Sequence, residues 1–480
     1  MLKVTADRPW WLHDVAATRR IEQQAAATLP AHTLMQRAGL ATARLALAIA
    51  PHARRIWVAC GPGNNGGDGL EAAVHLQHWG KSVAVTIAGD PDRFPPDAAA
   101  AWQKGRAAGL PLVSPPPAEW DLCIDALLGI GAARPLQGAV ADTAGRIAAG
   151  RGLVLAVDVP SGLAADTGQG DGVRADHTLC LLTLKPGLFT ARGRDASGQV
   201  WFDDLQVPAP AGSACAGLAG PPRRQARPHA SHKGSYGDVA VVGGAPGMGG
   251  AAVLAAHAAL SAGAGRVFLC PLDERAGALV PGLPELMVRD WGSLPLETLA
   301  VACGCGGGTA VAAALPTVLA RARSLVLDAD GLNAVAADPA LQQELCKRAA
   351  RGQPTVLSPH PLEAARLLGA DTTRVQADRL RSAGELAQRF GCVVVLKGSG
   401  TVVAAPGALP RINPTGNARL ATGGTGDVLA GMLAAGLAAA EGDAAQPASA
   451  AVYRHGLLAD RWPADRPLTA GALAGARLAP

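Results

Sequence analysis

The densest group of chemically useful residues in the first half is the segment Gly61–Gly69, which reads GPGNNGGDG and directly follows the apolar run RIWVAC. Glycines let a backbone turn sharply and approach a ligand closely. A helix that starts here offers free N–H groups and a positive dipole end to an anion. A tight strand-to-helix turn is the alternative, but a turn alone does not need Asn64, Asn65 and Asp68. Since the spacing is not GxGxxG, a dinucleotide fingerprint is not established.

Further polar residues stand at the ends of two other apolar runs, where Asp125 begins DALLGIG and Asp158 begins DVPSG, which includes Ser161. Ligands of open α/β sheets bind outside the carboxyl ends of the strands. An oxygen-rich set of this kind suits a hard cation. A single Asp is more often a helix cap or an Asx turn, but three such loops in one half favour a site.

In the second half, Gly423–Leu429 reads GGTGDVL and opens an apolar helical stretch. A glycine-rich loop at a helix N-terminus can hold phosphate and stabilise the charge of phosphoryl transfer. Asp427 is placed to accept a proton from a substrate hydroxyl. Asp is also favoured near helix starts for purely structural reasons, yet the density of the motif favours function.

Three more segments of the second half follow predicted strands: Gly243–Gly250, Ser358–Glu363 and Lys397–Thr401. KGSGT links two strands and would serve well as a hairpin turn, or contact a nucleotide. His360 precedes Pro361, which suits a first helical turn. A lone His is more often structural, but its place at a strand end favours a ligand contact.

Continuous apolar runs separated by helical patterns predict parallel sheets covered on both faces. The predicted strands are 55–60, 82–88, 122–128 and 153–159, then 238–244, 266–272, 299–305, 324–330, 355–360, 393–398 and 401–406. A helical pattern runs from Gly67 to Trp79. Between the two sets lies a stretch rich in Pro, Gly and Ala, typical of a linker. We therefore expect an α/β fold in two domains, residues 1–210 and 229–480, joined by a linker at 211–228.

The composition narrows the class of protein. Of 480 residues 49% are hydrophobic and 17% charged, with a mixed net charge of +5, which predicts large cores and argues against disorder. Aromatic residues make up only 3%, which argues against nucleic-acid binding. Nine scattered cysteines without a CxxC pair suggest a reducing compartment. Neither a signal peptide nor an apolar span of membrane length is present, so we expect a cytoplasmic protein that binds no membrane.

The motifs GPGNNGGDG, DALLGIG and DVPSG, in that order, resemble the epimerase domain of the NAD(P)H-hydrate repair enzymes, a likeness that covers roughly residues 13–205. The resemblance implies a Rossmann-like three-layer fold and a potassium ion held by Asn65, Asp125 and Ser161. Since inversion at C6 needs proton transfer or reversible loss of water, we expect Asp158 to be the general acid/base. The implied contacts to the hydrate are Asn64, Asn65, Gly66, Gly67, Asp68, Gly129, Ile130, Gly131, Ala132, Ala133, Arg134, Pro135 and Asp158.

The second half, from about residue 229 to 470, resembles the dehydratase domain of the same family, which is ribokinase-like. The motifs are KGSYGDVAVVGG, LDADGLN, LSPHPLEAARLLG, VVVLKGSGTVV and NPTGNARLATGGTGDVLAG. The implied reaction uses ADP, with Mg²⁺, to phosphorylate the hydroxyl of NADHX or NADPHX and then eliminates phosphate. Gly249, Gly308, His360 and Asp427 would contact the hydrate, with Asp427 as base. The implied nucleotide contacts are Lys397, Gly398, Ser399, Gly400, Thr401 and Gly426.

Two positions depart from the family pattern. Leu362 stands where HPGE has its glycine, and Cys305 lies in GCGGG where the family usually has GPGLG. Two other functions stay open: a ribokinase-like small-molecule kinase, and a first half that is a nucleotide-binding regulatory module. The choice between ADP and ATP also stays open, and a homo-oligomer is expected by analogy.

Overall fold

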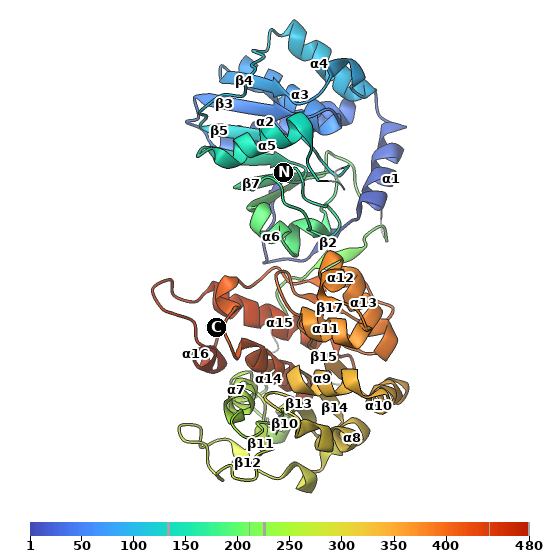
Figure 1. The fold of residues 1–480 in the computed structure, drawn as a ribbon, viewed down its shortest axis with the longest axis vertical. Helices are drawn as coiled ribbons and strands as arrows, with labels where there is room; N and C mark the ends of the chain where they lie inside the picture. Colours follow the sequence, from blue (N-terminus) through green and yellow to red (C-terminus); the bar gives the residue numbers. More distant parts are fainter. Residues whose placement is uncertain (132–134, 211, 224–226, 441, 479–480) are drawn as a thin grey trace. The chain divides into compact units, whose positions relative to one another are not determined.

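The computed structural model describes residues 1–131, 135–210, 212–223, 227–440 and 442–478, and the chain forms two compact units. The first comprises Met1–Thr5 and Trp10–Gly217; the second comprises Ala6–Pro9 and Leu218–Pro480. Figure 1 colours the first unit from blue to green and the second from yellow-green to red. The stretch expected as a linker contains a short strand, β9 (Ala216–Leu218), and its residues 211 and 224–226 lie outside the described part.

The first unit is built on a seven-stranded sheet in the order β1-β8-β7-β6-β5-β3-β4. All neighbouring pairs are parallel except β1 with β8. Its strands are β1 (Leu2–Lys3), β3 (Arg55–Cys60), β4 (Ser82–Ile87), β5 (Leu122–Ala126), β6 (Leu153–Val157), β7 (His177–Leu181) and β8 (Gln199–Asp203); β2 (Trp10–Leu12) lies outside this sheet.

Helices cover both faces of this sheet. They are α1 (Val15–Ala26), α2 (Thr33–Ile49), α3 (Asn64–His78), α4 (Pro96–Ala107), α5 (Gly138–Ala149) and α6 (Gly193–Ala196). Alternate side chains of β3 point to opposite faces: Ile56 and Val58 pack in the core with α2 and α3, while Trp57 and Ala59 pack in the core with α5. The result is a three-layer unit.

The second unit has a larger sheet, in which the strands follow the order β12-β11-β10-β13-β14-β15-β16-β17-β18 and β9 comes next. The pairs from β12 to β16 are parallel, whereas β16, β17 and β18 pair antiparallel. The strands are β10 (Asp238–Gly243), β11 (Arg266–Pro271), β12 (Met287–Val288), β13 (Ala300–Cys303), β14 (Ser324–Leu327), β15 (Thr355–Leu357), β16 (Val393–Leu396), β17 (Val402–Ala404) and β18 (Arg411–Ile412).

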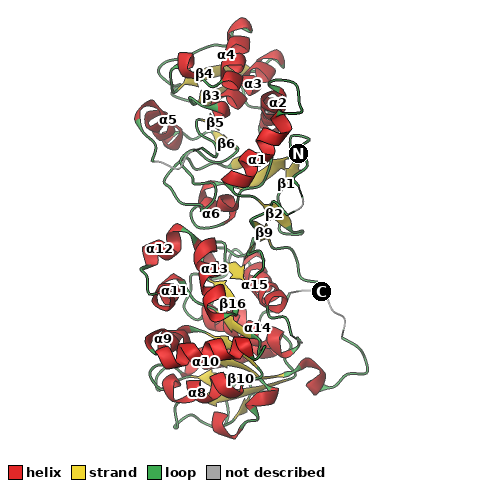
Figure 2. Cartoon of the chain, turned by 90° about the vertical axis from the view of Figure 1, so that its right-hand side faces the viewer, coloured by secondary structure: helices red, strands yellow, loops and turns green. Residues whose placement is uncertain are grey.

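This sheet also separates two apolar cores, and helices surround the strands of each unit in Figure 2. One core includes residues of α8 (Val311–Arg321), α9 (Ala329–Ala337), α10 (Pro339–Ala350), α11 (Pro361–Leu368), α12 (Thr372–Ala377) and α13 (Arg379–Phe390). The other includes residues of α7 (Gly249–Ser261), α14 (Thr425–Ala438) and α15 (Ala445–Asp460), and α16 (Ala470–Gly475) packs on α7.

The predicted α/β class is confirmed for both halves. Several boundaries were wrong. The strand expected at 324–330 ends at Leu327, and α9 begins at Ala329. The helix expected from Gly67 begins at Asn64, so most of GPGNNGGDG forms the first turns of α3 rather than a loop. Its glycines serve helix packing, because a Cβ on Gly66 would lie 2.1 Å from the carbonyl oxygen of Gly61. Seven strands of the described chain were not predicted: β1, β2, β7, β8, β9, β12 and β18.

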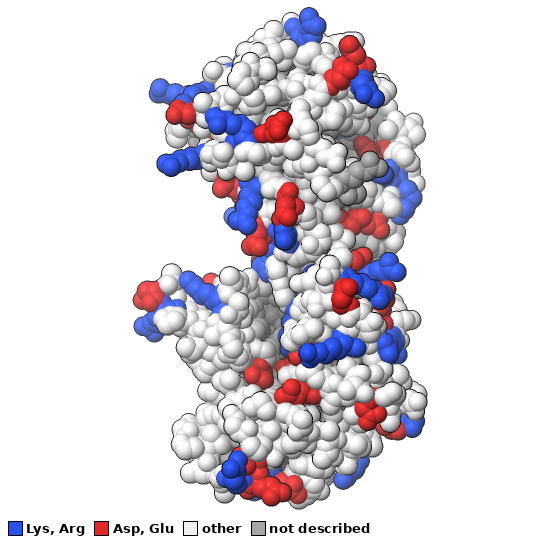
Figure 3. All heavy atoms as spheres, in the orientation of Figure 1, with Lys and Arg blue, Asp and Glu red and all other residues white. Residues whose placement is uncertain are grey.

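Acidic and basic side chains are interleaved over the face of the molecule shown in Figure 3. In the described part of the chain, no helix has the length and apolar character required to cross a lipid bilayer.

Candidate active sites

The first candidate site lies where the strand order reverses. The chain passes from β3 to β4 on one side and then to β5 on the other. Such switch points open a crevice at the carboxyl ends of the strands. Asn65 follows β3, Asp125 lies near the end of β5, and Asp158 follows β6.

Asp158 forms an ion pair with Lys185, whose Nζ also donates to the carbonyl oxygen of Leu181 at 2.7 Å. Only 1% of the Lys185 side chain is exposed. Burial opposes the positive charge of Lys185, but the Asp158 carboxylate outweighs it, and the net pKa of Lys185 is raised. Asp158 has a φ of 67°, a left-handed conformation that is costly for a residue other than glycine. This strain and the buried pair mark Asp158 as a functional candidate.

Gly129 brings Asn65 and Asp158 together. A Cβ at position 129 would lie 3.2 Å from Oδ1 of Asn65 and 3.3 Å from Oδ2 of Asp158. Asn65 is buried, and its Nδ2 has no hydrogen-bond partner within the described residues. A buried amide without a partner carries an energetic cost that a ligand can remove.

Asp125 and Ser161 form a buried oxygen cluster beside these residues. The Ser161 hydroxyl donates to Oδ1 of Asp125 at 2.6 Å, and the Ser161 N–H donates to Oδ2 at 2.9 Å. Burial raises the pKa of the fully buried Asp125 carboxyl, while hydrogen bonds from Ser161 and Leu127 oppose that rise. Among the described residues, no Lys or Arg donates a hydrogen bond to the Asp125 carboxyl. An oxygen-rich set of this kind suits a hard cation.

Two other acids face Asp158. Desolvation, followed by the charges of Asp158 and Glu22, raises the pKa of Asp68 well above its ordinary value. Burial and then Asp158 also raise the pKa of Glu22, on α1. Carboxyl groups with perturbed pKa values cluster at functional sites, so Asp68 and Glu22 join Asp158 as candidates.

The remaining predicted contacts of the first half differ in burial. Asn64 is exposed, whereas Gly66 and Gly67 are buried in α3. Ile130 and Gly131 continue the loop after Gly129, and Pro135 is exposed. Ala132, Ala133 and Arg134 lie outside the described residues.

The second candidate site also lies at a switch point, here between β10 and β13. The loop after β10 leads to Gly249, and the loop after β13 leads to Gly308. A Cβ on Gly308 would lie 2.9 Å from Cε of Met248, so the two loops adjoin. The Gly308 N–H donates to Oδ2 of Asp330 at 2.8 Å, which adds the first turn of α9, just after β14, to the same edge of the sheet.

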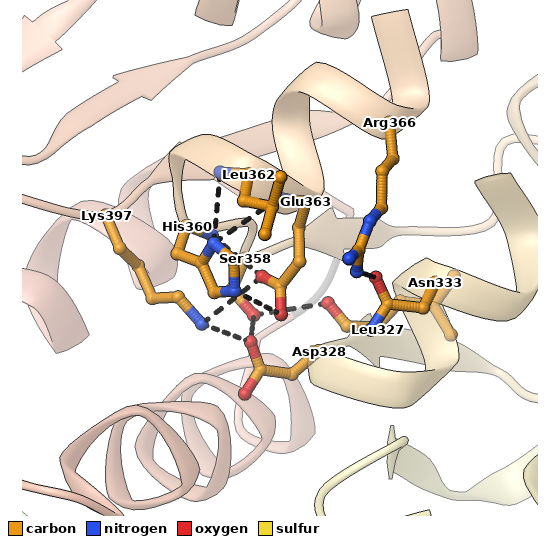
Figure 4. Close-up of polar contacts among 9 residues, drawn as sticks. All are labelled: Leu327, Asp328, Asn333, Ser358, His360, Leu362, Glu363, Arg366 and Lys397. Carbon is orange, nitrogen blue, oxygen red and sulfur yellow. Dashed lines mark hydrogen bonds and ion pairs between the residues drawn. The ribbon is translucent and has the colours of Figure 1, made fainter. Parts of the chain in front are cut away.

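A buried ion-pair network joins three strand ends (Figure 4). The Lys397 Nζ lies 2.5 Å from Oδ1 of Asp328 and 3.9 Å from Oε2 of Glu363. Ser358 also donates to Asp328, at 3.0 Å. Burial opposes the charge of Lys397, but Asp328 and Glu363 outweigh it and its pKa is raised. Lys397 is therefore a fixed positive charge at the site.

His360 has a clear structural role. Its Nδ1 accepts hydrogen bonds from the N–H groups of Leu362 and Glu363, at 3.1 and 3.3 Å. Glu363 in turn accepts from the His360 N–H at 2.7 Å, which completes a capping box at the start of α11. Burial and the charge of Lys397 lower the pKa of His360, so the ring is neutral at pH 7.

Asp427 lies in the first turn of α14. Burial and the nearby Asp328 raise the pKa of its carboxyl to about 6, against the opposing effects of Cys305 and Lys397. Donor atoms of Cys305, Asp328 and Asp427 lie within 4.8 Å of one another. Since Lys397 pairs with Asp328, the lysine already supplies positive charge to this cluster. A general base with a pKa near the working pH is well suited to proton transfer.

The predicted nucleotide contacts meet around Lys397. A Cβ on Gly426 would lie 3.5 Å from its Nζ. Lys397–Thr401 forms the connection of an antiparallel pair, β16 and β17, as the hairpin alternative predicts. The buried Arg379 stabilises this turn, because its guanidinium donates hydrogen bonds to the carbonyl oxygens of Leu396 and Lys397, both at 3.1 Å. Ser399 is exposed and Gly400 is buried.

Sequence reasoning missed Lys185, Glu22 and Cys305. The available signal for Lys185 was a single charge in the apolar segment LCLLTLKPG, because a buried lysine requires a carboxylate partner.

Each of the two α/β units has a polar cluster at the point where its strand order reverses, which is where such folds bind ligands. This arrangement is that of a two-domain enzyme. The family model of NAD(P)H-hydrate dehydratase matches residues 239–476, and that of the YjeF-related protein N-terminus matches residues 31–187. The bifunctional NAD(P)H-hydrate repair enzyme Nnr of Escherichia coli K12 is 37% identical over 89% of this chain and 84% of its own length. The enzyme of the same name from Coxiella burnetii is 35% identical over 90% of each chain. The chain belongs to the family of bifunctional NAD(P)H-hydrate repair enzymes.

Solved structures match the second half. An ADP/ATP-dependent NAD(P)H-hydrate dehydratase from Bacillus subtilis, co-crystallised with ATP/Mg²⁺, is 34% identical over 52% of this chain and 90% of that chain, with a TM-score of 0.43. A ribokinase-like superfamily protein from Enterococcus faecalis is 25% identical over 52% of this chain and 88% of that chain, with a TM-score of 0.44.

Proposed function

We propose that the first unit interconverts the R and S epimers of NADHX and NADPHX, and that the second dehydrates the S epimer with ADP. The observation that carries this proposal is the pairing, within one chain of this family, of two separate polar clusters at two switch points. Such a fusion has a chemical logic, since a dehydratase selective for one epimer would leave the other unrepaired.

In the second unit, Asp427 accepts the proton of the C6 hydroxyl as that oxygen bonds to the terminal phosphorus of ADP and AMP leaves. The C6–O bond then breaks with release of phosphate, and a proton leaves the neighbouring carbon to restore the ring. Lys397 and the N-terminus of α14 stabilise the negative charge of the transferred group. Gly398–Thr401 and Gly426 line the nucleotide, and Gly249, Gly308 and His360 line the hydrate. Mg²⁺, bound together with ADP, would neutralise the phosphates.

In the first unit, Asp158 is the proposed general acid/base. Inversion at C6 requires proton transfer or reversible loss of water. Lys185 holds the carboxylate in its strained conformation. Asn64–Asp68, Gly129–Gly131 and Pro135 surround the hydrate in this proposal, and Ala132–Arg134 would continue that contact.

Asn65, Asp125 and Ser161 would hold K⁺ beside this centre. The support is the buried Asp125 carboxylate, whose hydrogen bonds come from hydroxyl and N–H groups. The ion would neutralise that carboxylate. Thermal unfolding provides a readout that does not depend on activity: KCl is expected to raise the Tm more than choline chloride does, and Asp125→Asn should remove the difference.

We further place the protein in the cytoplasm as a homo-oligomer acting on small molecules. Free thiols at all nine cysteines, each within the described residues, are consistent with a reducing compartment.

The direct test uses a mixture of R and S hydrated NADH with enzyme, K⁺, Mg²⁺ and ADP, followed by the absorbance of reduced nicotinamide and by phosphate release. Recovery of the whole mixture is expected. Recovery of one epimer alone would contradict the role of the first unit. If neither ADP nor ATP restores NADH, a small-molecule kinase becomes the better account.

A further inference from the structure

Cys305 lies on the loop between β13 and α8, beside the proposed base. Glycines on both sides have left-handed backbone, with φ of 117° at Gly304 and 56° at Gly306. The loop is fixed to the loop after β10, since the Gly244 N–H donates to the carbonyl oxygen of Cys305 at 3.0 Å and the Ala245 N–H donates to that of Gly306 at 2.7 Å. The position of the Cys305 side chain is therefore set by backbone contacts on both sides.

The Cys305 side chain is fully buried in the apolar core that includes α14, on the same face of the sheet as Asp427. Its Sγ lies within 4.8 Å of carboxylate oxygens of both Asp427 and Asp328. Burial and these two carboxylates raise the pKa of the Cys305 thiol well above its ordinary value. The group is thus an S–H, and a thiol in this environment can donate a hydrogen bond.

We propose that Cys305 is a positioning residue of the dehydratase site, whose S–H donates a hydrogen bond to the Asp427 carboxylate and keeps it oriented and ionised. A donor to the charged form favours that form. In agreement, interaction with the Cys305 thiol lowers the pKa of Asp427, against the raising effects of burial and Asp328.

The other groups around Asp427 do not duplicate this role. Asp328 and Asp330, from the β14 end and α9, repel the carboxylate, while Lys397 attracts it but forms its close ion pair with Asp328. On α15, His455 contacts the carbonyl oxygen of Thr425 at 3.0 Å, and on α7, His257 lies against Gly475. Cys305 adds a buried thiol whose Sγ lies within 4.8 Å of an Asp427 carboxylate oxygen.

The inference rests on the proposed role of Asp427, and the pH dependence of kcat/KM for ADP-dependent dehydration tests it. We expect Cys305→Ala to raise the midpoint of the acid limb by about half a pH unit or more, because the Asp427 carboxylate loses the thiol as a hydrogen-bond donor. Cys305→Ser should restore at least half of that shift. Cys303→Ala is the matched control, since Cys303 is equally buried but packs in the opposite core.

A second measurement does not need activity. The infrared difference between the wild type and Cys305→Ala isolates the S–H stretching band of Cys305. We expect this band to move to higher frequency in Asp427→Asn, because the thiol loses its charged acceptor. A band that stays in place, or an acid limb that is the same in the wild type, Cys305→Ala and Cys305→Ser, would overturn the inference. A wild type without dehydratase activity would instead contradict the proposed function, and the infrared comparison would still decide the hydrogen bond.

Discussion

Each unit buries one lysine against an aspartate at the end of a parallel strand, but the two pairs are used differently. In the first unit Lys185 pairs directly with Asp158, the proposed acid/base. In the second unit Lys397 pairs with Asp328, and the proposed base, Asp427, comes from the N-terminus of α14.

The difference shows how a similar ion pair can support two kinds of chemistry. The direct pair fixes the geometry of Asp158 in a strained backbone conformation. In the second unit the close partner of Lys397 is Asp328, so Asp427 has no close ion pair of its own with this lysine. Because Asp427 is partly desolvated, the pKa of its carboxyl is about 6, and it can exchange a proton near neutral pH. Lys397 remains available to neutralise a phosphoryl group.

The largest expected effect comes from Asp427→Asn. The amide cannot accept the hydroxyl proton, so ADP-dependent NADH recovery should fall by about 10²–10⁴-fold. Epimerisation, followed by chromatographic separation of the two epimers, should be unchanged. Asp465→Asn, at an exposed position, serves as the control. A comparable loss of epimerisation would break the assignment of one reaction to each unit.

Asp158→Asn is the reciprocal change. Epimerisation should fall by about 10²-fold or more, while dehydration of purified S hydrate continues at the wild-type rate. The exposed Asp142 of α5 provides the matched substitution, Asp142→Asn. Wild-type epimerisation in Asp158→Asn would remove Asp158 from the mechanism.

Gly66→Ala tests whether tight packing of α3 positions the first site. The added Cβ would lie 2.1 Å from the backbone oxygen of Gly61. We therefore expect the free energy of unfolding of the first unit to be about 3 kcal/mol lower in Gly66→Ala than in the wild type. Gly63→Ala is the control, because a Cβ there meets nothing within 4 Å. Denaturant unfolding of both variants is the measurement, and equal midpoints would contradict the packing argument.

The smallest effect concerns stability and pH. Because the folded pKa of Asp427 is raised to about 6, its stabilising contribution is present in acid and is lost as the pH rises through 6. Asp427→Asn should therefore gain stability over the wild type as the pH rises from about 4 to about 7, by about 1–2 kcal/mol after allowance for partial exposure. Thermal unfolding across this pH range measures the difference. A constant gap between the two proteins would show that the carboxyl does not titrate there.

Much of the fold could be predicted from apolar runs, because strands buried on both faces are continuously hydrophobic. The strands β7 and β8 were missed since HTLCL and QVWFD contain polar residues. The start of α3 was missed because glycine usually ends a helix, whereas here it allows close backbone contact.

The parts of the two sites that could not be predicted depend on contacts between residues far apart in the sequence. Asp158 and Asp427 could be proposed from their own motifs. The partner Lys185 lies in an apolar segment and Cys305 in a glycine-rich turn, neither of which points to a carboxylate, and only the folded chain brings them to Asp158 and Asp427. Their separation from those carboxylates, 27 residues for Lys185 and much more for Cys305, leaves no local periodic signal.

The central claim, that two independent sites share one chain, is tested most directly by mixing the two single variants. Asp158→Asn and Asp427→Asn are combined with R and S hydrated NADH, K⁺, Mg²⁺ and ADP, over a time that is short compared with uncatalysed epimerisation. The account predicts that Asp158→Asn alone recovers only the S epimer, Asp427→Asn alone recovers none, and the mixture recovers all of the NADH. A mixture that recovers no more than Asp158→Asn alone would contradict it.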